Sequence, residues 1–254
     1  MRIARFNYKS KQDWGIVKDS QIIILKDSPF AGVELTSEKI PLDKVKLLAP
    51  GCAAGKIVLT GLNYRDHAKE LGMALPQEPV IFLKPATSLI GHGGNIIYPE
   101  GVSRLDYEAE LALVIKKTGR NIPEDKAAEY ILGYTCLNDV TARGLQKKDI
   151  QWTRAKSFDT FCPLGPWLET ELDTSNLKIA SYLNGGKKQD STTANLIFSA
   201  NYLVSFISKI MTLLPGDIIS TGTPCGVGPM AAGDKIEVEI EGIGLLTNQV
   251  ARAS

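Results

Sequence analysis

Short runs of apolar and β-branched residues, separated by Gly, Pro, Asn and Asp, dominate this chain and predict a protein built mainly from β-strands. In the first fifty residues these runs predict strands at 1–6, 14–17 and 21–25. Later runs predict strands at 56–60, 80–83, 94–98, 108–116, 131–138, 165–168, 177–183, 217–222 and 235–240. We therefore expect a β-rich α+β fold, with a small β domain at 1–50 and the main domain at 51–254.

Three stretches have helical spacing instead. Residues 63–72 predict a short helix with Asn63 as its N-cap and Gly72 as its C-terminal stop, and residues 124–130 predict an amphipathic helix. Residues 199–213 place large apolar side chains along one face, which we expect to pack against the sheet: Tyr202, Leu203, Phe206, Ile207 and Ile210. Because the helices are few and do not alternate with the strands, the pattern argues against a doubly wound sheet.

Composition narrows the classes of function. Of 254 residues, 29 are Lys or Arg and 28 are Asp or Glu, so no excess of positive charge points to nucleic acid or to a membrane surface. The first residues lack the apolar stretch of a signal peptide, and no segment reaches the ~20 apolar residues of a membrane helix. The cysteines form no C-x-x-C pair: Cys52, Cys136, Cys162 and Cys225. We expect a cytoplasmic protein without disulfides.

Two carboxylates two residues apart, Glu108 and Glu110, open the apolar run at 108–116. On a strand this spacing places both side chains on one face, where they repel each other and resist burial. A hard divalent cation between them would remove both costs, and carboxylate oxygens suit Mg²⁺, Mn²⁺ or Ca²⁺. The alternative is a solvated strand face with two ordinary glutamates.

Asp139 offers a third carboxylate at the end of the apolar run 131–138, where a strand would deliver it to the edge of a sheet. The same position also suits an ordinary cap for the segment that follows. Together with Glu108 and Glu110, it would form an all-oxygen site that leaves positions open for water or substrate. A His-rich zinc site is excluded, because the chain has only two histidines.

His67 and Glu70 lie three residues apart and share one face of the predicted helix 63–72. A carboxylate beside an imidazole fixes its tautomer and raises its basicity, which suits a general base that deprotonates water. The alternative is a surface helix with charged neighbours, and spacing alone favours it. Farther along, Lys156 lies in an aromatic-rich segment at 151–166 that predicts an ordered loop. This lysine either stabilises developing negative charge or extends along the surface.

Segments at 61–70, 81–85, 106–111, 138–143, 154–166 and 214–224 together resemble the fumarylacetoacetate hydrolase superfamily, in its order, from Gly61 to the C-terminus. The resemblance is to the smaller members, which include acylpyruvate hydrolases, oxaloacetate decarboxylases and 2-hydroxyhepta-2,4-diene-1,7-dioate isomerases. It implies a catalytic domain folded as a mixed β-sandwich roll, a small variable N-terminal domain and a homodimer. Gly144 departs from the family, which more often has Asp at this position.

The resemblance also implies a set of site residues. Glu108, Glu110 and Asp139 would bind Mg²⁺ or Mn²⁺. The pair His67 and Glu70 would activate water on a lid that orders over the substrate. The residues that would contact a 2-oxo acid or its enolate are Lys156, Arg143, Gln146 and Thr223.

These residues imply an enzyme that acts on 2-oxo acids through a metal-stabilised enolate, and we expect hydrolysis of the C–C bond of acylpyruvates. Decarboxylation of oxaloacetate and isomerisation of a 2-hydroxydienoate are alternatives, because the same metal site supports all three reactions. Outside enzymes, the alternatives are a non-catalytic metal-binding scaffold, against which His67 and Glu70 argue, and a Ca²⁺-stabilised β-domain, for which Asp-rich loops are lacking. We expect residues 72–78 and 184–196 to select the substrate, and no nucleic acid or membrane partner.

Overall fold

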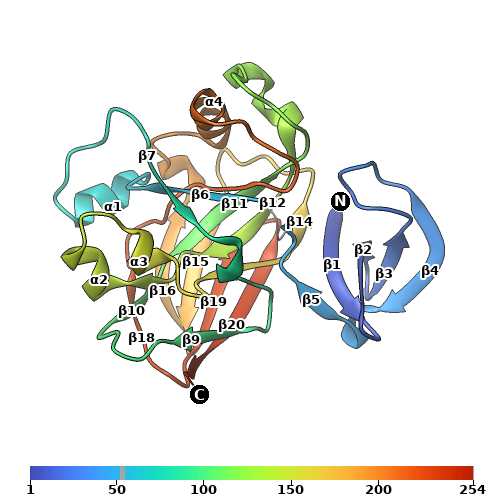
Figure 1. Cartoon of the computed structure of the whole chain (residues 1–254), viewed down its shortest axis with the longest axis horizontal. Helices are drawn as coiled ribbons and strands as arrows, with labels where there is room; N and C mark the ends of the chain where they lie inside the picture. The colour runs from blue at the N-terminus through green and yellow to red at the C-terminus, as the bar shows by residue number, and fades with distance from the viewer. Residues whose placement is uncertain (52–54, 254) are drawn as a thin grey trace.

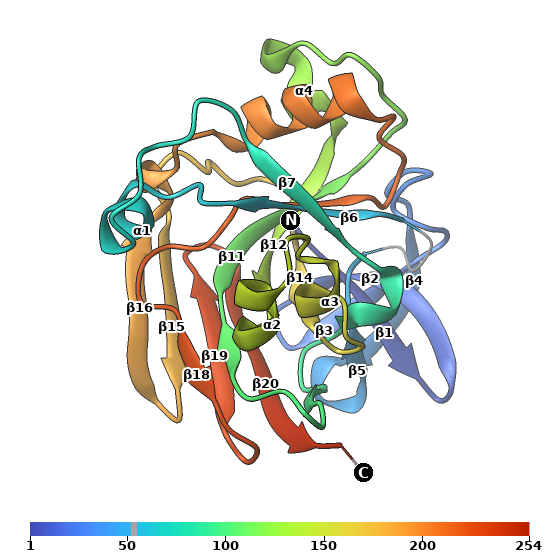
Figure 2. The ribbon, with the colours of Figure 1, turned by 60° about the vertical axis from the view of Figure 1, so that its left-hand side comes forward.

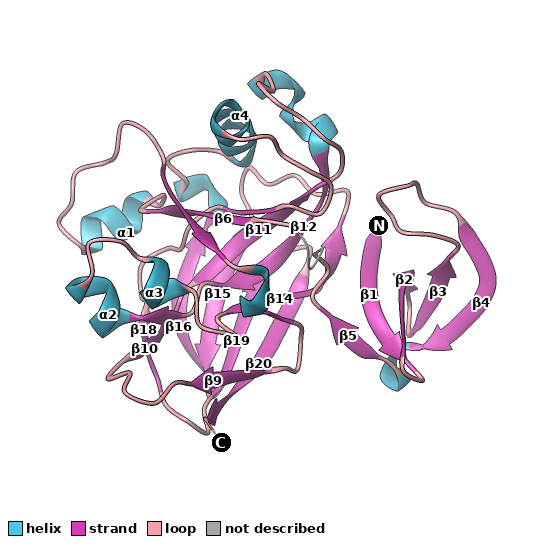
Figure 3. Cartoon of the chain, viewed as in Figure 1, coloured by secondary structure: helices cyan, strands magenta, loops and turns pink. Residues whose placement is uncertain are grey.

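The computed structural model describes residues 1–51 and 55–253 and confirms a β-rich α+β fold (Figure 3). The largest sheet contains both antiparallel and parallel pairs. Its strand order is β4 (Leu35–Pro41), β3 (Gln21–Leu25), β2 (Lys11–Lys18), β1 (Arg2–Tyr8), β14 (Cys162–Glu169), β12 (Ile131–Asn138), β11 (Ala109–Ile115), β17 (Ile218–Ser220), β6 (Ile57–Gly61) and β7 (Val80–Lys84), with β5 (Lys46–Leu48) beside β1 and β8 (Leu89–Ile90) beside β14.

A second sheet packs against the first and gives the fold its sandwich character. Its strand order is β16 (Gly186–Thr192), β15 (Lys178–Leu183), β19 (Lys235–Ile240), β20 (Gly244–Arg252) and β9 (Asn95–Tyr98). A small sheet completes the set, with the order β13 (Thr141–Ala142), β10 (Leu105–Tyr107) and β18 (Gly228–Met230).

Helices occupy two places around the sheets (Figures 1 and 2). The short helices α1 (Arg65–Glu70), α2 (Arg143–Lys148) and α3 (Thr153–Lys156) lie on the side of the molecule away from the N-terminal strands, and α4 (Ala200–Ile210) lies across β11 and β12. Short 3-10 helices occupy Leu42–Lys44, Ala86–Ser88, Glu124–Tyr130 and Thr193–Asn195. The helix predicted at 124–130 is present as a 3-10 helix, and the loop predicted at 151–166 contains α3 and the start of β14.

Strand β11 is buried on both faces, which explains the apolar run 111–115 that follows Glu110. Leu111 and Leu113 belong to a core shared with β15, β19 and α4. Ala112 and Val114 point to the other face and pack with residues of β6, β12 and β14. The strand therefore lies in the middle of the sandwich, and its first residues meet the ends of β12 and β17.

The N-terminal strands β1–β4 form a meander with its own apolar core (Figure 1). Strand β1 also continues the large sheet, because Arg2 and Ile3 pair with Glu169 and Leu168 of β14. The division of the chain at residue 50 stays a prediction.

The sequence predicted neither disulfides nor a membrane-spanning helix. Cys136, Cys162 and Cys225 are free thiols, and Cys52 lies outside the described residues. Within 1–51 and 55–253, no helix combines the length and the apolar character needed to cross a membrane. The cytoplasmic location stays a prediction.

The buried face of α4 differs from the predicted one. Leu203 and Ile207 are fully buried, as expected, but Val204 is buried as well, and Ile210 is 50% exposed. The prediction for Ile210 was wrong because the buried face is centred on Val204 and Ile207 rather than on Phe206. Ser199 caps the helix, since its side chain accepts a hydrogen bond from the backbone N–H of Tyr202.

The helix offers a matched test of this assignment. We expect Leu203→Ala to lower the free energy of unfolding by about 2–5 kcal/mol, because it leaves a cavity in the shared core. We expect Ile210→Ala, an exposed change on the same helix, to cost less than about 1 kcal/mol. Urea unfolding of both variants measures the difference, and equal losses would contradict the assignment of the buried face.

Candidate active site

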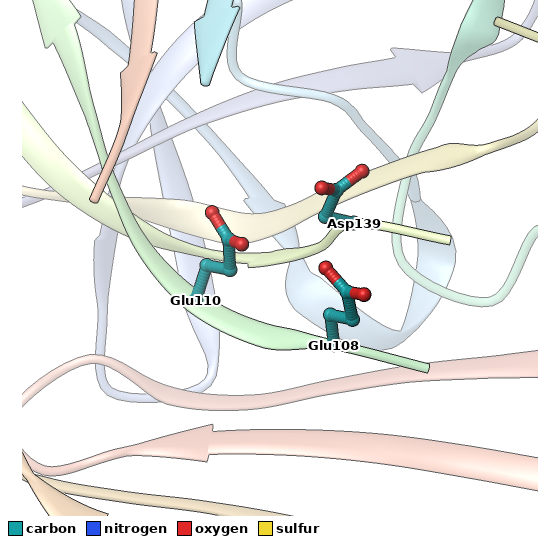
Figure 4. Close-up of side chains that lie close together, drawn as sticks. All are labelled: Glu108, Glu110 and Asp139. Atoms are coloured by element: carbon teal, nitrogen blue, oxygen red, sulfur yellow. The ribbon is translucent and has the colours of Figure 1, made fainter. Parts of the chain in front are cut away.

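Three carboxylates meet at the end of the central strands (Figure 4). Glu108, Glu110 and Asp139 each present an oxygen, and these oxygens all lie within 4.8 Å of one another. All three side chains are buried. The pairing of Ala109 with Asn138 explains the meeting, because it sets the start of β11 beside the end of β12.

Glu108 does not lie on a strand, so the prediction of one strand face bearing both glutamates was wrong. Glu108 separates β10 from β11, at the point where the chain passes from the small sheet to the large one. Its backbone N–H donates to Asn138 Oδ1 at 2.9 Å, and its carbonyl accepts from the N–H of Asp139 at 2.9 Å. Glu108 and Glu110 nevertheless converge with Asp139, as Figure 4 shows.

Lys156 is buried against this cluster and does not extend along the surface. Its Nζ lies 3.0 Å from Glu108 Oε2 and also donates to Asp139 Oδ2. Arg143 forms a second ion pair with Glu108 through Nη2 and holds Asp106 through Nε at 2.8 Å. These two cations partly neutralise the carboxylates without any ion from solvent.

Lys84 is another buried cation, and it lies in the family segment 81–85 without an assigned role. Its Nζ lies 2.8 Å from Asp139 Oδ1. Its three protons have other acceptors, because Nζ donates to the backbone carbonyls of Val140, Lys156 and Phe161 at 3.0, 2.6 and 2.8 Å. In the sequence, Lys84 directly follows the predicted strand 80–83. A lysine at such a position is ordinarily exposed, so its burial was not predicted.

The two glutamates have opposite electrostatic environments. Burial raises the pKa of Glu108, but the charges of Lys156 and Arg143 outweigh it and lower that pKa to about 2. Burial raises the pKa of Glu110 well above its usual value, and the nearby charges of Asp139 and Glu108 raise it further. Glu110 is thus the carboxylate that most lacks a cation.

One buried oxygen of the cluster has an ion-pair partner but no hydrogen bond, which suits a metal ligand. Asp139 Oδ1 lies 2.8 Å from Lys84 Nζ but accepts no hydrogen bond from the described residues, because the protons of Lys84 are directed to carbonyls. Glu110 Oε2 accepts from Ser220 Oγ and from the N–H of Gly222, and these contacts fix its orientation. A buried, oxygen-only set of anionic ligands suits Mg²⁺ or Mn²⁺.

The predicted pair His67 and Glu70 forms on α1. His67 Nδ1 lies 2.8 Å from Glu70 Oε2, and Glu70 Oε1 accepts from the backbone N–H of Gly226 at 3.1 Å. Both contacts fix the imidazole relative to the loop after β17. His67 is mostly buried, in contrast to the alternative of a surface helix with charged neighbours.

Asn63 does not cap this helix, contrary to the prediction. Helix α1 begins after Tyr64, and no side chain caps it. The amide of Asn63 instead donates to the carbonyls of Phe198 and Thr221 and accepts from the N–H of Phe198. Asn63 thereby ties the start of α1 to the end of β17, and Gly72 follows the helix with a positive φ of 63°, as expected of a stop.

The predicted substrate residues line the same cavity. Arg143, Gln146 and Thr223 border a cavity of about 270 Å³ together with His67, Lys156 and the three carboxylates. Arg143 Nη1 donates to Gln146 Oε1 at 2.6 Å within α2, so the glycine between them does not separate the pair. A larger cavity of about 730 Å³ lies elsewhere, beside Trp167 and the N-terminal strands, and contains none of these residues.

The structure combines a β-rich α+β fold with a carboxylate triad that could bind a metal, and comparison with known proteins gives the family. Residues 56–251 match the family described as fumarylacetoacetate (FAA) hydrolase C-terminal, and residues 1–50 match the Rv2993c-like N-terminal family. The chain belongs to the fumarylacetoacetate hydrolase family.

Individual relatives support this membership. An uncharacterized protein of Archaeoglobus fulgidus is 56% identical over 214 residues, covering 84% of this chain and 85% of the relative. The Bos taurus protein named oxaloacetate tautomerase FAHD2A, mitochondrial, is 41% identical over 223 residues, covering 83% and 71%. A crystal structure titled 5-carboxymethyl-2-hydroxymuconate delta-isomerase, from Mycobacterium smegmatis, is 42% identical, covers 100% of both chains and superposes with a TM-score of 0.94.

The cluster predicts how metal affinity responds to a single change. We expect Glu110→Gln to weaken Mg²⁺ or Mn²⁺ binding by at least roughly 10- to 100-fold, the range seen when even the outer-shell partners of metal sites are changed. Calorimetric titration of the metal-free protein measures this, and Glu100→Gln, at an exposed acidic position, is the matched control. Unchanged affinity in Glu110→Gln, or full activity of Glu110→Ala after treatment with EDTA, would contradict the site.

Proposed function

We propose that the protein is a Mg²⁺- or Mn²⁺-dependent enzyme that hydrolyses the C–C bond of acylpyruvates. The observation that carries the proposal is the cavity of about 270 Å³ that His67 shares with Glu108, Glu110 and Asp139. A general base and a set of metal ligands are thus within reach of one small substrate. A metal-binding scaffold without activity would not need His67 and Glu70 to be held in this geometry.

When bound by these three carboxylates, a divalent ion would polarise the carboxylate and keto oxygens of a 2-oxo acid and stabilise its enolate. His67 would activate the attacking water molecule. Glu70 holds Nδ1, so Nδ1 carries the proton and Nε2 is free to take a proton from a water molecule. The resulting hydroxide attacks the distal carbonyl carbon, and the bond between that carbon and C3 breaks. Its electron pair passes into the enolate of pyruvate, which then takes a proton at C3, and the acyl group leaves as a carboxylic acid.

The cations beside the cluster would act on the developing charge. Nearby carboxylates, above all Asp139, raise the pKa of Lys156 in spite of its burial, so its ammonium stays protonated. Two of its three protons contact Glu108 and Asp139, and the third remains to meet an anionic oxygen of the substrate. Arg143, Gln146 and Thr223 would fix the 2-oxo acid in the cavity.

A second candidate is keto–enol tautomerisation of oxaloacetate, or isomerisation of a related enol acid. It is favoured by the names of the relatives at 41% and 42% identity, an oxaloacetate tautomerase and a delta-isomerase. Both reactions move a proton between carbon and oxygen and consume no water, so His67 would shuttle the proton instead. A screen of acylpyruvates, oxaloacetate and 2-hydroxydienoates with Mg²⁺ present tests which reaction is fastest.

Removing the imidazole of His67 tests its role as the general base. We expect His67→Ala to lower kcat/KM for acylpyruvate hydrolysis by roughly 10²–10⁴, the usual contribution of a general base. Metal affinity should stay within about threefold of the parent, because His67 is not a ligand. Steady-state kinetics and a metal titration measure both quantities. Hydrolysis at the parent rate in His67→Ala would place the base elsewhere.

The roles of His67, Glu70 and Lys156 separate when a reaction that needs no water is compared with hydrolysis. Oxaloacetate decarboxylation should lose less kcat/KM in His67→Ala and Glu70→Ala than acylpyruvate hydrolysis does. Lys156→Met should impair both reactions, because both pass through an enolate. The measurement is kcat/KM for both substrates in all three variants. Equal losses throughout would show that His67 and Glu70 act mainly by closing or positioning the site.

A further inference from the structure

Gln189 of β16 contacts the backbone and a side chain of the candidate site, although most residues of its lysine-containing strand are exposed. Its side chain is fully buried and reaches out of its own sheet. Oε1 accepts from the N–H of Ala109 at 3.0 Å and from the hydroxyl of Ser181 at 3.0 Å. Nε2 donates to Thr223 Oγ1 at 2.8 Å and to the carbonyl of Pro224 at 3.0 Å.

These contacts fix which end of the amide is which. The backbone N–H of Ala109 can only donate, and the carbonyl of Pro224 can only accept. A flipped amide would therefore set two donors against each other at Ala109 and two acceptors against each other at Pro224. All four hydrogen-bonding positions of the Gln189 amide are in use, so its orientation is determined by backbone groups that cannot adapt.

The fixed amide determines the role of the Thr223 hydroxyl. Because Nε2 donates to Thr223 Oγ1, the proton of that hydroxyl must be donated to another group. Thr223 lines the cavity that holds the carboxylate cluster. The hydroxyl is thereby set to donate to an anionic oxygen placed in that cavity, such as a carboxylate oxygen of a 2-oxo acid.

The other end of the amide supports the metal ligands. Ala109 separates Glu108 from Glu110, and its N–H is held by Gln189 Oε1. One side chain therefore contacts both the backbone between two proposed metal ligands and a proposed substrate-binding hydroxyl. Gly226 keeps the loop close to β16, since a Cβ at this residue would lie 2.5 Å from the carbonyl oxygen of Lys188.

We propose that Gln189 is a positioning residue that makes Thr223 a hydrogen-bond donor to the substrate and fixes the backbone between the metal ligands. The inference rests on the proposed function, because it needs a 2-oxo acid or its enolate in the cavity. A purely structural glutamine would instead affect stability, metal binding and substrate binding together. The two ends of the amide allow these possibilities to be separated.

The variant Gln189→Glu separates a positioning role of Gln189 from a purely structural one. The glutamate keeps an acceptor for Ala109, but its second oxygen draws the Thr223 proton away from the cavity and also faces the carbonyl of Pro224. Oxalate, a planar dianion with two adjacent carboxylate groups, serves as a non-reacting mimic of the enolate of a 2-oxo acid. We expect Mg²⁺ affinity within about threefold of the parent and oxalate affinity, with Mg²⁺ saturating, lower by roughly 10- to 100-fold, the effect of losing a hydrogen bond to a charged group. Gln189→Met, which loses both ends, should weaken both.

A double-mutant cycle with Thr223→Val excludes simple charge repulsion. In the Thr223→Val background, Gln189→Glu should weaken oxalate binding by less than about twofold, because the hydroxyl is already gone. Gln249→Glu, on an exposed position of β20, controls for the added charge. Calorimetric titration of the metal-loaded proteins gives all the affinities, and circular dichroism checks folding.

The outcomes distinguish a failure of the proposed function from a failure of the proposed role of Gln189. If the metal-loaded parent neither binds oxalate nor turns over a 2-oxo acid, the proposed function fails. If the parent does so and Gln189→Glu binds oxalate as the parent does, the role of Gln189 is overturned. An equal loss from Gln189→Glu with and without the Thr223 hydroxyl also overturns it. In that case the added charge, and not the hydroxyl, explains the loss.

Discussion

The balance of charge around the buried carboxylates at the sheet junction is the constraint on which the site depends. Four buried carboxylates, Asp106, Glu108, Glu110 and Asp139, face four cations there: the buried Lys84 and Lys156, the partly buried Arg143 and the exposed Arg104. Burying ion pairs is costly, so such a cluster is weak evidence for stability and better explained by function. Among the described residues, no cation forms an ion pair with Glu110. A bound divalent ion would add two positive charges beside it, and the enolate of a 2-oxo acid carries two negative charges. The proposed substrate and ion together would therefore preserve the balance.

Most strands could be predicted from the sequence because their buried side chains are apolar. Two of the missed strands bury a polar residue instead. Strand β20 turns Asn248 inward, where its amide donates to the carbonyls of Gly91 and Gly94, and this polar residue interrupts the apolar alternation. Strand β16 turns Gln189 inward between the exposed residues Lys188 and Asp190. In each case tertiary hydrogen bonds stabilise a residue that local pattern assigns to the surface.

The candidate site also has a part that could be predicted from the sequence and a part that could not. The carboxylates and the pair His67 and Glu70 could be predicted, because their spacing and the family segments depend on neighbours in sequence. Their environment could not. Lys84 contacts Asp139 across 55 residues of chain, and the charge that lowers the pKa of Glu108 comes from Lys156 and Arg143 on other elements. Glu108 was assigned to a strand because nothing local marks the junction of two sheets. That junction depends on β13 and β18, which pair with β10 from distant parts of the chain.

The parts of the site differ in how firmly the fold holds them, and this difference bears on the reaction. The carboxylates lie at the ends of central strands, whereas His67 lies on a helix of six residues, too short to be stable alone. Side-chain contacts hold that helix, since Asp66 accepts from Ser191 of β16 and Glu70 accepts from the N–H of Gly226. In the proposed reaction, the strands would fix where the enolate forms, and β16 and the loop after β17 would fix where the base lies. Hydrolysis, decarboxylation and tautomerisation would share the first requirement and differ in the second. On this proposal, the choice among them would depend on the contacts that place α1, not on the metal ligands.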